Sequence, residues 1–372
     1  MNRGSFLLLA LSCAGCFELD YVGQAAEGQL DLLCRARSIE SSLENPDIAP
    51  ERRKLLAEVP AIKKFGQEAG SLTPTSSYET YVDLDRSDVV FVVTAAPPLS
   101  LEPKRWWFPI VGSISYLGWF DEHLAKNYAN ELAEDGWDVD VRGAAAYSTL
   151  GWFSDPVLST MIEDGDDALG ELANTILHES VHATIYVPGQ PDFNEGIASF
   201  VGDRLTLDYL AKHFGAGSPQ LENYVEGEER GAKIRDELVE AHTALKALYE
   251  SDLPDEEKLA KKKAFLTDLR KHLRFRRPIT NATLANYNAY HGAEGDFAKL
   301  FEACGSDVRR VVAACKTAGA ADFELADAPE GETPSSRSQR AISQAIDLLA
   351  KRCAPADAQP ADAQPASTTD AR

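Results

Sequence analysis

The sequence lacks any hydrophobic run long enough to cross a bilayer. Its longest apolar segment, Phe6–Leu11, is far shorter than the roughly 20 residues that a membrane-spanning helix needs. Basic residues are also scarce, because 37 Lys and Arg stand against 59 Asp and Glu and leave a net charge of −22. Such a surface repels phosphates, so we expect no nucleic-acid partner. The 44% of hydrophobic residues among 372 exclude a wholly disordered or fibrous chain.

The N-terminus has the features of an export signal over residues 1–16. A positive charge at Arg3 precedes the short apolar run, and small residues lead to Cys16. This segment resembles the lipobox of bacterial lipoproteins, with Cys16 as the lipidated residue and Cys13 as the alternative. An ordinary signal peptide with incidental cysteines is the other interpretation. Because Phe17 follows Cys16, we expect a lipid anchor to the membrane of the cell envelope, in the outer membrane facing the periplasm.

Cysteines are few beyond the signal region, and none has the spacing of metal ligands. They are Cys34, Cys304, Cys315 and Cys353. Export would place them in an oxidising compartment, where disulfides form. Cys304 and Cys315 could pair across adjacent helices, although spacing does not establish a pairing.

The rest of the chain is predicted to form an α+β fold with an N-terminal mixed sheet and a mostly helical C-terminal part. Over 17–165 we expect helices at 17–70 and 121–135, and strands at 78–82, 89–93, 106–111 and 137–141. Over 166–327 we expect helices at 166–186 and 195–213, an antiparallel pair over 226–276 that turns at Pro254, and another pair to about 318. Residues 328–372 are rich in Ala, Pro, Ser and Asp and are predicted to be a mostly disordered tail, with a short helix possible at 341–349.

The most informative motif is HExxH, formed by His178, Glu179 and His182. On a helix, residues four apart share one face, so the two imidazoles can bind one zinc ion. Glu179 then lies beside the open coordination position and can accept a proton from the attacking water. Apolar residues around the motif predict that its helix is buried.

A third ligand is available thirteen residues after His182. The turn-rich linker at 187–192 is followed by Asn194 and Glu195 at the start of a second helix, which can fold back on the first. Two His and one Glu with water in the fourth position form the ligand set of a catalytic zinc. The alternative is a pair of core histidines with Glu179 as a buried hydrogen-bond partner.

With these residues the chain resembles the gluzincins, and more of it resembles the putative zinc aminopeptidase family of bacterial lipoproteins. The resemblance extends over most of residues 17–318 and includes segments 21–33, 106–109, 142–156 and 281–290 besides the zinc motif. It implies a zincin-like fold and a Zn²⁺-dependent peptidase that removes N-terminal residues from peptide substrates. It also implies an oxyanion donor after the third ligand, with Tyr290 as first choice and Tyr287 and His291 as alternatives.

The resemblance further implies an edge strand before the zinc helix that binds substrate backbone. Tyr147, Ser148 and Thr149 occupy that position, and a core strand is the alternative. Ser199 stands where gluzincins often place an Asp, and Asp203 could orient a ligand histidine instead. The carboxylate that binds the substrate amine is left open among Glu122, Asp155, Glu163, Asp164 and others.

Two other functions are kept beside the aminopeptidase. One is a zinc endopeptidase with the same chemistry, because no residue pattern shows what blocks the cleft. The other is a non-enzymatic envelope lipoprotein with a structural or inactive metal site. The presence of Glu179 argues against the latter, since a structural site needs ligands but no base.

Overall fold

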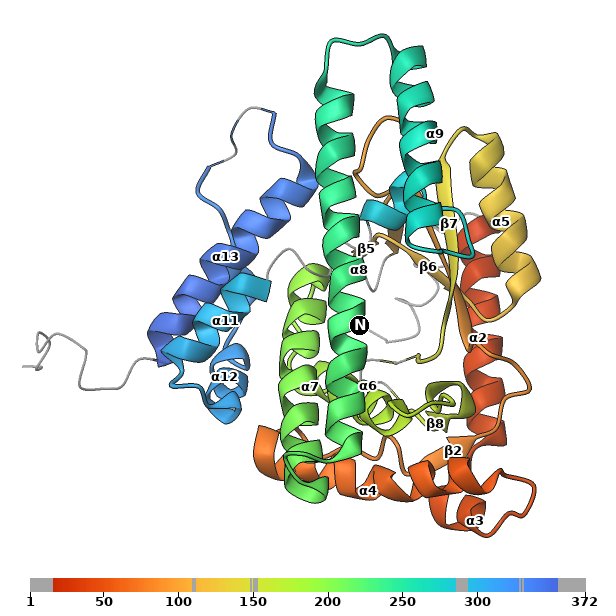
Figure 1. Cartoon of the computed structure of the whole chain (residues 1–372), viewed down its shortest axis with the longest axis vertical. Helices are drawn as coiled ribbons and strands as arrows, with labels where there is room; N and C mark the ends of the chain where they lie inside the picture. The colour runs from red at the N-terminus through yellow and green to blue at the C-terminus, as the bar shows by residue number, and fades with distance from the viewer. Residues whose placement is uncertain are drawn as a thin grey trace, which may run out of the picture.

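The computed structural model describes residues 16–108, 112–147, 149, 153–285, 294–327, 329 and 331–353. The fold is α+β and mostly helical, and the strands among the described residues are short and lie in the first half of the chain (Figure 1). This confirms the α+β part of the predicted fold class. The prediction of one mixed sheet is wrong, however, because the described strands form three separate small sheets.

The N-terminal region is helical as predicted. It contains α2 (Cys16–Arg35), α3 (Ile39–Leu43) and α4 (Pro50–Gly70). Helix α4 begins with proline at its first turn and continues through Pro60. It crosses the base of the molecule beneath α6 and α7 (Figure 1). Its buried side chains, among them Leu56, Val59 and Ile62, therefore support the central helices.

Strands β1 (Arg37–Ser38), β2 (Thr80–Val82) and β8 (Val157–Leu158) form the first sheet, in which β2 pairs antiparallel with β1 and parallel with β8. The second sheet is antiparallel and has the order β6 (Leu117–Trp119), β3 (Val90–Ala96), β7 (Asp138–Ala144). Strands β4 (Trp106–Phe108) and β5 (Gly112–Ile114) form a separate antiparallel pair. Helix α5 (Glu122–Glu134) packs on the second sheet, and Asp121 caps its N-terminus.

The molecule is organised around α6 (Ala168–His182) and α7 (Pro191–Phe214), which lie side by side at its centre (Figure 1). A short 3₁₀ turn, η1 (Ser159–Met161), precedes them. The expected antiparallel pair follows as α8 (Pro219–Glu250) and α9 (Asp255–His272). Buried Lys262 on α9 holds this hairpin to the second sheet, because its ammonium pairs with Asp138 at 2.5 Å and donates to the Pro98 carbonyl.

The C-terminal region differs from the sequence prediction. After α11 (Glu294–Ala303), α12 (Val308–Cys315) and η2 (Ala320–Phe323), residues Pro334–Cys353 form the 20-residue helix α13. The short helix suggested at 341–349 is present, but the predicted disorder is wrong over 334–340 and 350–353, because α13 extends further in both directions. Ile342, Ile346 and Leu349 give this helix a continuous buried face. The suggested Cys304–Cys315 pair is also wrong: Cys304 is bonded to Cys353, and Cys315 is a buried thiol.

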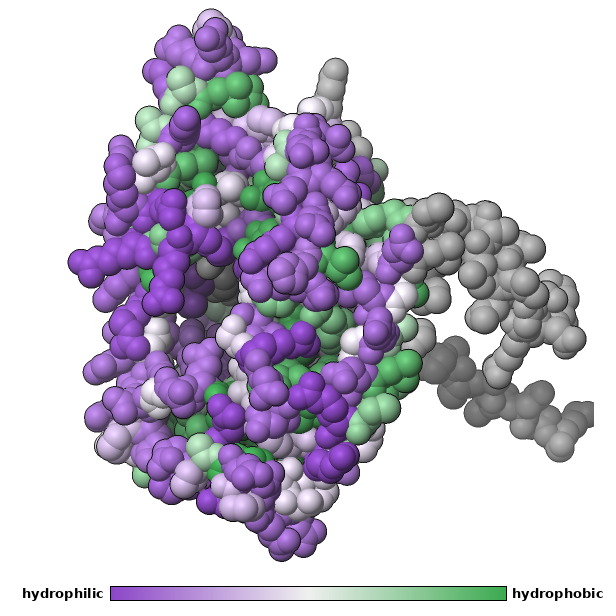
Figure 2. Space-filling model, turned by 90° about the vertical axis from the view of Figure 1, so that its right-hand side faces the viewer, coloured by the Kyte–Doolittle hydropathy of each residue, from purple (hydrophilic) through white to green (hydrophobic). Residues whose placement is uncertain are grey.

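One hydrophobic core includes residues from Leu32 on α2 to Cys353 on α13, so the N-terminal and C-terminal parts share it. Within the described residues, no helix has the length and apolar character needed to cross a membrane. Figure 2 shows that hydrophilic residues cover most of one face, as the excess of acidic residues leads one to expect.

Candidate metal centre

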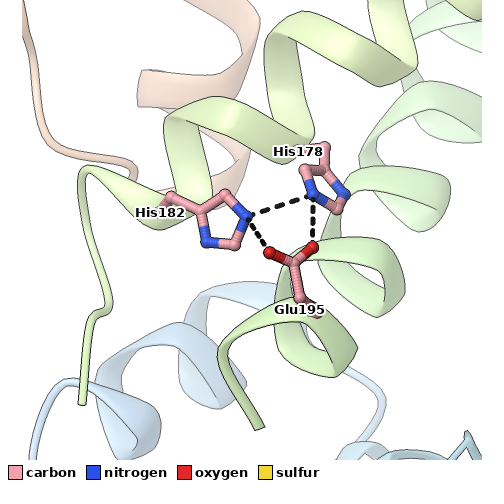
Figure 3. Close-up of side chains that lie close together, drawn as sticks. All are labelled: His178, His182 and Glu195. Carbon is pink, nitrogen blue, oxygen red and sulfur yellow. Dashed lines mark hydrogen bonds and ion pairs between the residues drawn. The ribbon is translucent and has the colours of Figure 1, made fainter. Parts of the chain in front are cut away.

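Helix α6 carries the HExxH motif on a firmly buried support. Its apolar face is fully enclosed, and the side chains with 0% exposure are Leu172, Ala173, Ile176, Leu177 and Val181. Because this face packs against α4 and α7, the helix cannot rotate about its axis. His178 and His182 therefore project together from the edge that faces α7 (Figure 3).

Helix α7 approaches α6 closely at Gly202. A Cβ atom at this position would lie 3.2 Å from the Cα atom of His178, which is tighter than ordinary van der Waals contact. Glycine thus allows the two backbones to meet beside a motif histidine. The sequence contained this signal, but a single glycine inside a helix does not identify its neighbour.

A side-chain clamp closes the linker between the two helices. The Asn194 side chain accepts a hydrogen bond from the Val187 backbone N–H and donates one to the Val187 carbonyl, both at 2.9 Å. Asn194 is buried, and it immediately precedes Glu195 at the beginning of α7. The clamp ties the first turn of α7 to the linker that precedes it. Sequence reasoning noted Asn194 without predicting this contact.

His178, His182 and Glu195 come together in a compact group of donor atoms (Figure 3). The two histidine Nε2 atoms are 3.2 Å apart. The Glu195 carboxylate places one oxygen 3.5 Å from His178 Nε2 and the other 3.6 Å from His182 Nε2. Tetrahedral zinc with bonds of about 2.0–2.1 Å requires ligand atoms about 3.3 Å apart. The donor types and their spacing therefore fit a zinc ion.

The electrostatics of the group favour a cation between its members. Burial acts to raise the pKa of Glu195, but hydrogen bonds with His178 and His182 outweigh it and hold the pKa below its ordinary range. Burial acts to lower the pKa of His178, and the contact with Glu195 reverses the effect and raises it. A divalent cation bound between the two imidazoles would neutralise the negative charge of the ionised Glu195 carboxylate.

Two buried polar atoms near the site have no hydrogen-bond partner among the described residues. They are the carboxylate oxygen Oε2 of Glu179 and the ring nitrogen Nδ1 of His182. Unpaired buried polar atoms are costly and call for an explanation such as catalysis or an absent ligand. Burial raises the pKa of the Tyr78 phenol well above its ordinary value, and the negative charges of Glu179 and Asp155 add to this effect. Tyr78 thus lies near both carboxylates.

The predicted substrate-binding strand is not present at the described positions. Strand β7 ends at Ala144, and Tyr147 and Thr149 lie in the loop that follows. The polar groups of Thr149 form hydrogen bonds within that loop. Its backbone N–H and its hydroxyl donate to the Asp155 carboxylate, at 3.0 and 2.8 Å. The half-buried Tyr147 ring packs edge-on against Phe120. Ser148 lies outside the described residues.

Asp203 forms its hydrogen bond with Asn174 and not with a histidine of the motif. Its carboxylate accepts a hydrogen bond of 2.7 Å from Asn174, whose side chain also donates to Tyr224. Asn174 lies one turn before His178 on α6, so the support that Asp203 gives is indirect. Burial and the charge of Glu228 raise the pKa of Asp203 to about 6. Ser199 is half-buried on α7.

The remaining predicted residues are outside what can be described. Tyr287, Tyr290 and His291 fall in the segment 286–293, so the oxyanion donor stays a prediction. The backbone of Cys16 begins α2, while residues 1–15, which belong to the predicted signal segment, and the end of the chain after Cys353 lie beyond the described ranges.

Comparison with known proteins identifies the family of the chain. A family model described as "Putative aminopeptidase" matches residues 20–325, which include all three donors of the metal centre and Glu179. No curated protein and no solved structure matches the chain.

Proposed function

The chain belongs to the family described as "Putative aminopeptidase", and we propose that it is a zinc-dependent aminopeptidase with a zincin-like catalytic core. The observation that carries the zinc assignment is the convergence of His178, His182 and Glu195 at 3.2–3.6 Å. The two imidazole Nε2 atoms and the Glu195 carboxylate would hold the ion. When bound, zinc supplies Lewis-acid chemistry, which acidifies a water molecule and polarises a carbonyl oxygen.

Glu179 is the general base of the proposed reaction. The negative charge of Glu179 contributes to the raised pKa of His178, which supports a position close to the ligand group, and its Oε2 atom has no hydrogen bond within the described residues. Oε2 accepts a proton from the water that attacks the scissile carbonyl, and the resulting carboxylic acid donates it to the leaving amine nitrogen. Tyr290 remains the proposed donor to the oxyanion.

The test combines zinc analysis with peptide cleavage. Purified protein is loaded with zinc, the ion is counted per chain, and a peptide mixture is digested and its new termini are read by mass spectrometry. We expect about one zinc per chain and stepwise loss of N-terminal residues from unblocked peptides only. Equal cleavage of N-acetylated peptides would instead identify an endopeptidase. One bound zinc without any hydrolysis would identify a non-enzymatic metal site.

We also infer that the chain is exported and anchored by a lipid at Cys16. The Cys304–Cys353 disulfide supports export, because structural disulfides persist mainly in oxidising compartments. Intact-mass analysis of membrane-extracted protein tests this proposal. We expect a diacylglyceryl mass on a chain that begins at Cys16, lost in Cys16→Ser; the same modification on Cys13 would identify the alternative site.

A further inference from the structure

Selectivity for a free N-terminus requires a group that recognises the substrate amine, an inference that rests on the proposed function. A peptide α-amine has a pKa of about 7.7–8.0 and is mostly protonated at pH 7. A carboxylate is its natural partner, provided that it lies close to the metal ligands, keeps one oxygen free and is held in place.

Asp192 meets the first condition. It lies in the first turn of α7, three residues before Glu195, and residues at this spacing are neighbours on one face of a helix. The two carboxylates are also coupled electrically: burial raises the pKa of Asp192, and the negative charge of Glu195 contributes to the rise. Asp192 therefore lies beside the metal centre, on the helix that supplies its third ligand.

Asp192 is also held in place while keeping an oxygen available. Ser338 on α13 donates a hydrogen bond of 2.8 Å to Oδ2, whereas Oδ1 has no hydrogen bond to any described residue. The start of α13 is itself secured, because the Ser335 hydroxyl donates to Glu102 at 2.8 Å. The Asp192 side chain is half-buried, so it is both ordered and reachable.

The other acidic candidates meet these conditions less well. Both carboxylate oxygens of Asp155 already accept hydrogen bonds from Thr149. Glu122 pairs with Lys126 at 2.6 Å on the exposed side of α5. Glu163 and Asp164 are exposed in the loop before α6, where water screens their charges.

We propose that Asp192 binds the protonated α-amine of the substrate peptide through its Oδ1 atom, and so limits cleavage to the N-terminal residue. The exposed Arg105 guanidinium acts on the Asp192 carboxylate from the solvent side. Its positive charge opposes a bound ammonium group, so removing it should tighten amine binding while removing the carboxylate should weaken it.

The experiment measures amine binding separately from hydrolysis. Leucinamide and N-acetyl-leucinamide are titrated by calorimetry into metal-free protein, which cannot turn them over. The same preference is then measured as the kcat/KM ratio of an unblocked to an acetylated peptide with zinc-loaded protein. The variants are Asp192→Asn, Arg105→Gln and, as a control with the same change of charge on an exposed part of α7, Asp208→Asn.

We expect Asp192→Asn to weaken leucinamide binding by about 10- to 100-fold, the value of a charge-assisted hydrogen bond. Arg105→Gln should strengthen it by up to about fivefold, and Asp208→Asn should leave it unchanged. Unchanged leucinamide binding in Asp192→Asn, or binding by the wild type no tighter than that of N-acetyl-leucinamide, overturns the proposal.

If Asp192→Asn does not fold, the wild type decides, because leucinamide binding no tighter than that of N-acetyl-leucinamide shows that no group recognises the amine and overturns the proposal. The two hypotheses fail differently. A zinc-loaded wild type that hydrolyses no peptide refutes the aminopeptidase, whereas leucinamide binding that does not depend on Asp192 refutes only the amine anchor.

Discussion

Asn194 and Val187 are joined by two hydrogen bonds of 2.9 Å that close the linker between the two helices of the proposed metal centre. The residue after Asn194 is Glu195, so this contact controls the direction in which the third donor points. A linker that was free to vary would hold Glu195 at a range of distances from the histidines. The clamp reduces this freedom before any ion binds, and such preorganisation lowers the cost of binding.

Replacing Asn194 with Ala leaves the buried Val187 N–H without its partner, while the Val187 carbonyl keeps the hydrogen bond from the Gln190 backbone N–H at 3.2 Å. We expect a loss of about 1–3 kcal/mol in the free energy of unfolding, measured by urea denaturation of the metal-free protein. Zinc affinity should fall as well, because Glu195 loses its fixed position. Asn223→Ala, which removes a single exposed bond to the Asp166 carbonyl, is the matched control and should cost far less. Equal effects of the two variants would contradict the role of the clamp.

Glu179→Gln keeps the shape of the side chain and removes its ability to accept a proton. We expect kcat to fall by about a hundredfold to ten-thousandfold, the usual contribution of a general base. Zinc content should stay at that of the wild type, because Glu179 is not one of the three donors. Turnover is measured with an unblocked aminoacyl substrate and zinc by elemental analysis. If the variant retains its turnover at full zinc content, a residue other than Glu179 is the general base.

Glu195→Gln removes the only charged donor of the metal centre. Loss of a group that merely orients a ligand typically costs 10–100-fold in metal affinity, so loss of this ligand should cost more than about 100-fold. Competition with a chelator measures the affinity. Glu222→Gln on α8, at an exposed position, changes the charge equally and should have no effect. Zinc at a hundred times its Kd should stabilise the wild type by about 2.7 kcal/mol and the Glu195 variant hardly at all.

Reducing the Cys304–Cys353 bond should loosen α13. The bond closes a loop with a sequence separation of 49, and such a cross-link typically stabilises a protein by about 2–4 kcal/mol. Cys353→Ser is therefore expected to lower the free energy of unfolding by this amount and to expose α13 to hydrogen exchange. The exposed thiol of Cys34 provides the control, since Cys34→Ser breaks no bond. Unaltered protection of α13 in the Cys353 variant would count against the pairing.

Glu171 should make stability fall as the pH rises. Burial, together with the charges of Glu228 and Asp167, raises the pKa of Glu171 from 4.5 to about 7. Between these values the folded state retains a proton that the unfolded state has released, so increasing pH favours unfolding. Glu171→Gln should reduce this slope between pH 4.5 and 7 and stabilise the protein above pH 7. Urea denaturation at several pH values measures how the free energy of unfolding depends on pH. If this dependence is the same in the wild type and in Glu171→Gln, the prediction is wrong.

Local sequence patterns predicted the helices of this protein better than its sheets. Helix α5 lies within the predicted range 121–135, and Gly136 follows its end, although its buried face is formed by Ala125, Ala129 and Leu132 while Leu124 is exposed. By contrast, only β2, β3, β4 and β7 were recognised as strand segments, and none of the strand pairings was predicted. Strand pairing joins residues far apart in the chain, as in β2 with β8, and no local pattern encodes it.

The sequence alone predicted the candidate donors, because the helical period places His178 and His182 on one face wherever that helix lies. Whether Glu195 reaches them depends on contacts made only in the folded chain: the close approach at Gly202 and the clamp at Val187. The partner of Cys304 and the order of residues 334–353 were likewise decided by packing, since α13 is stabilised by burial against α11 and α12 more than by its own composition.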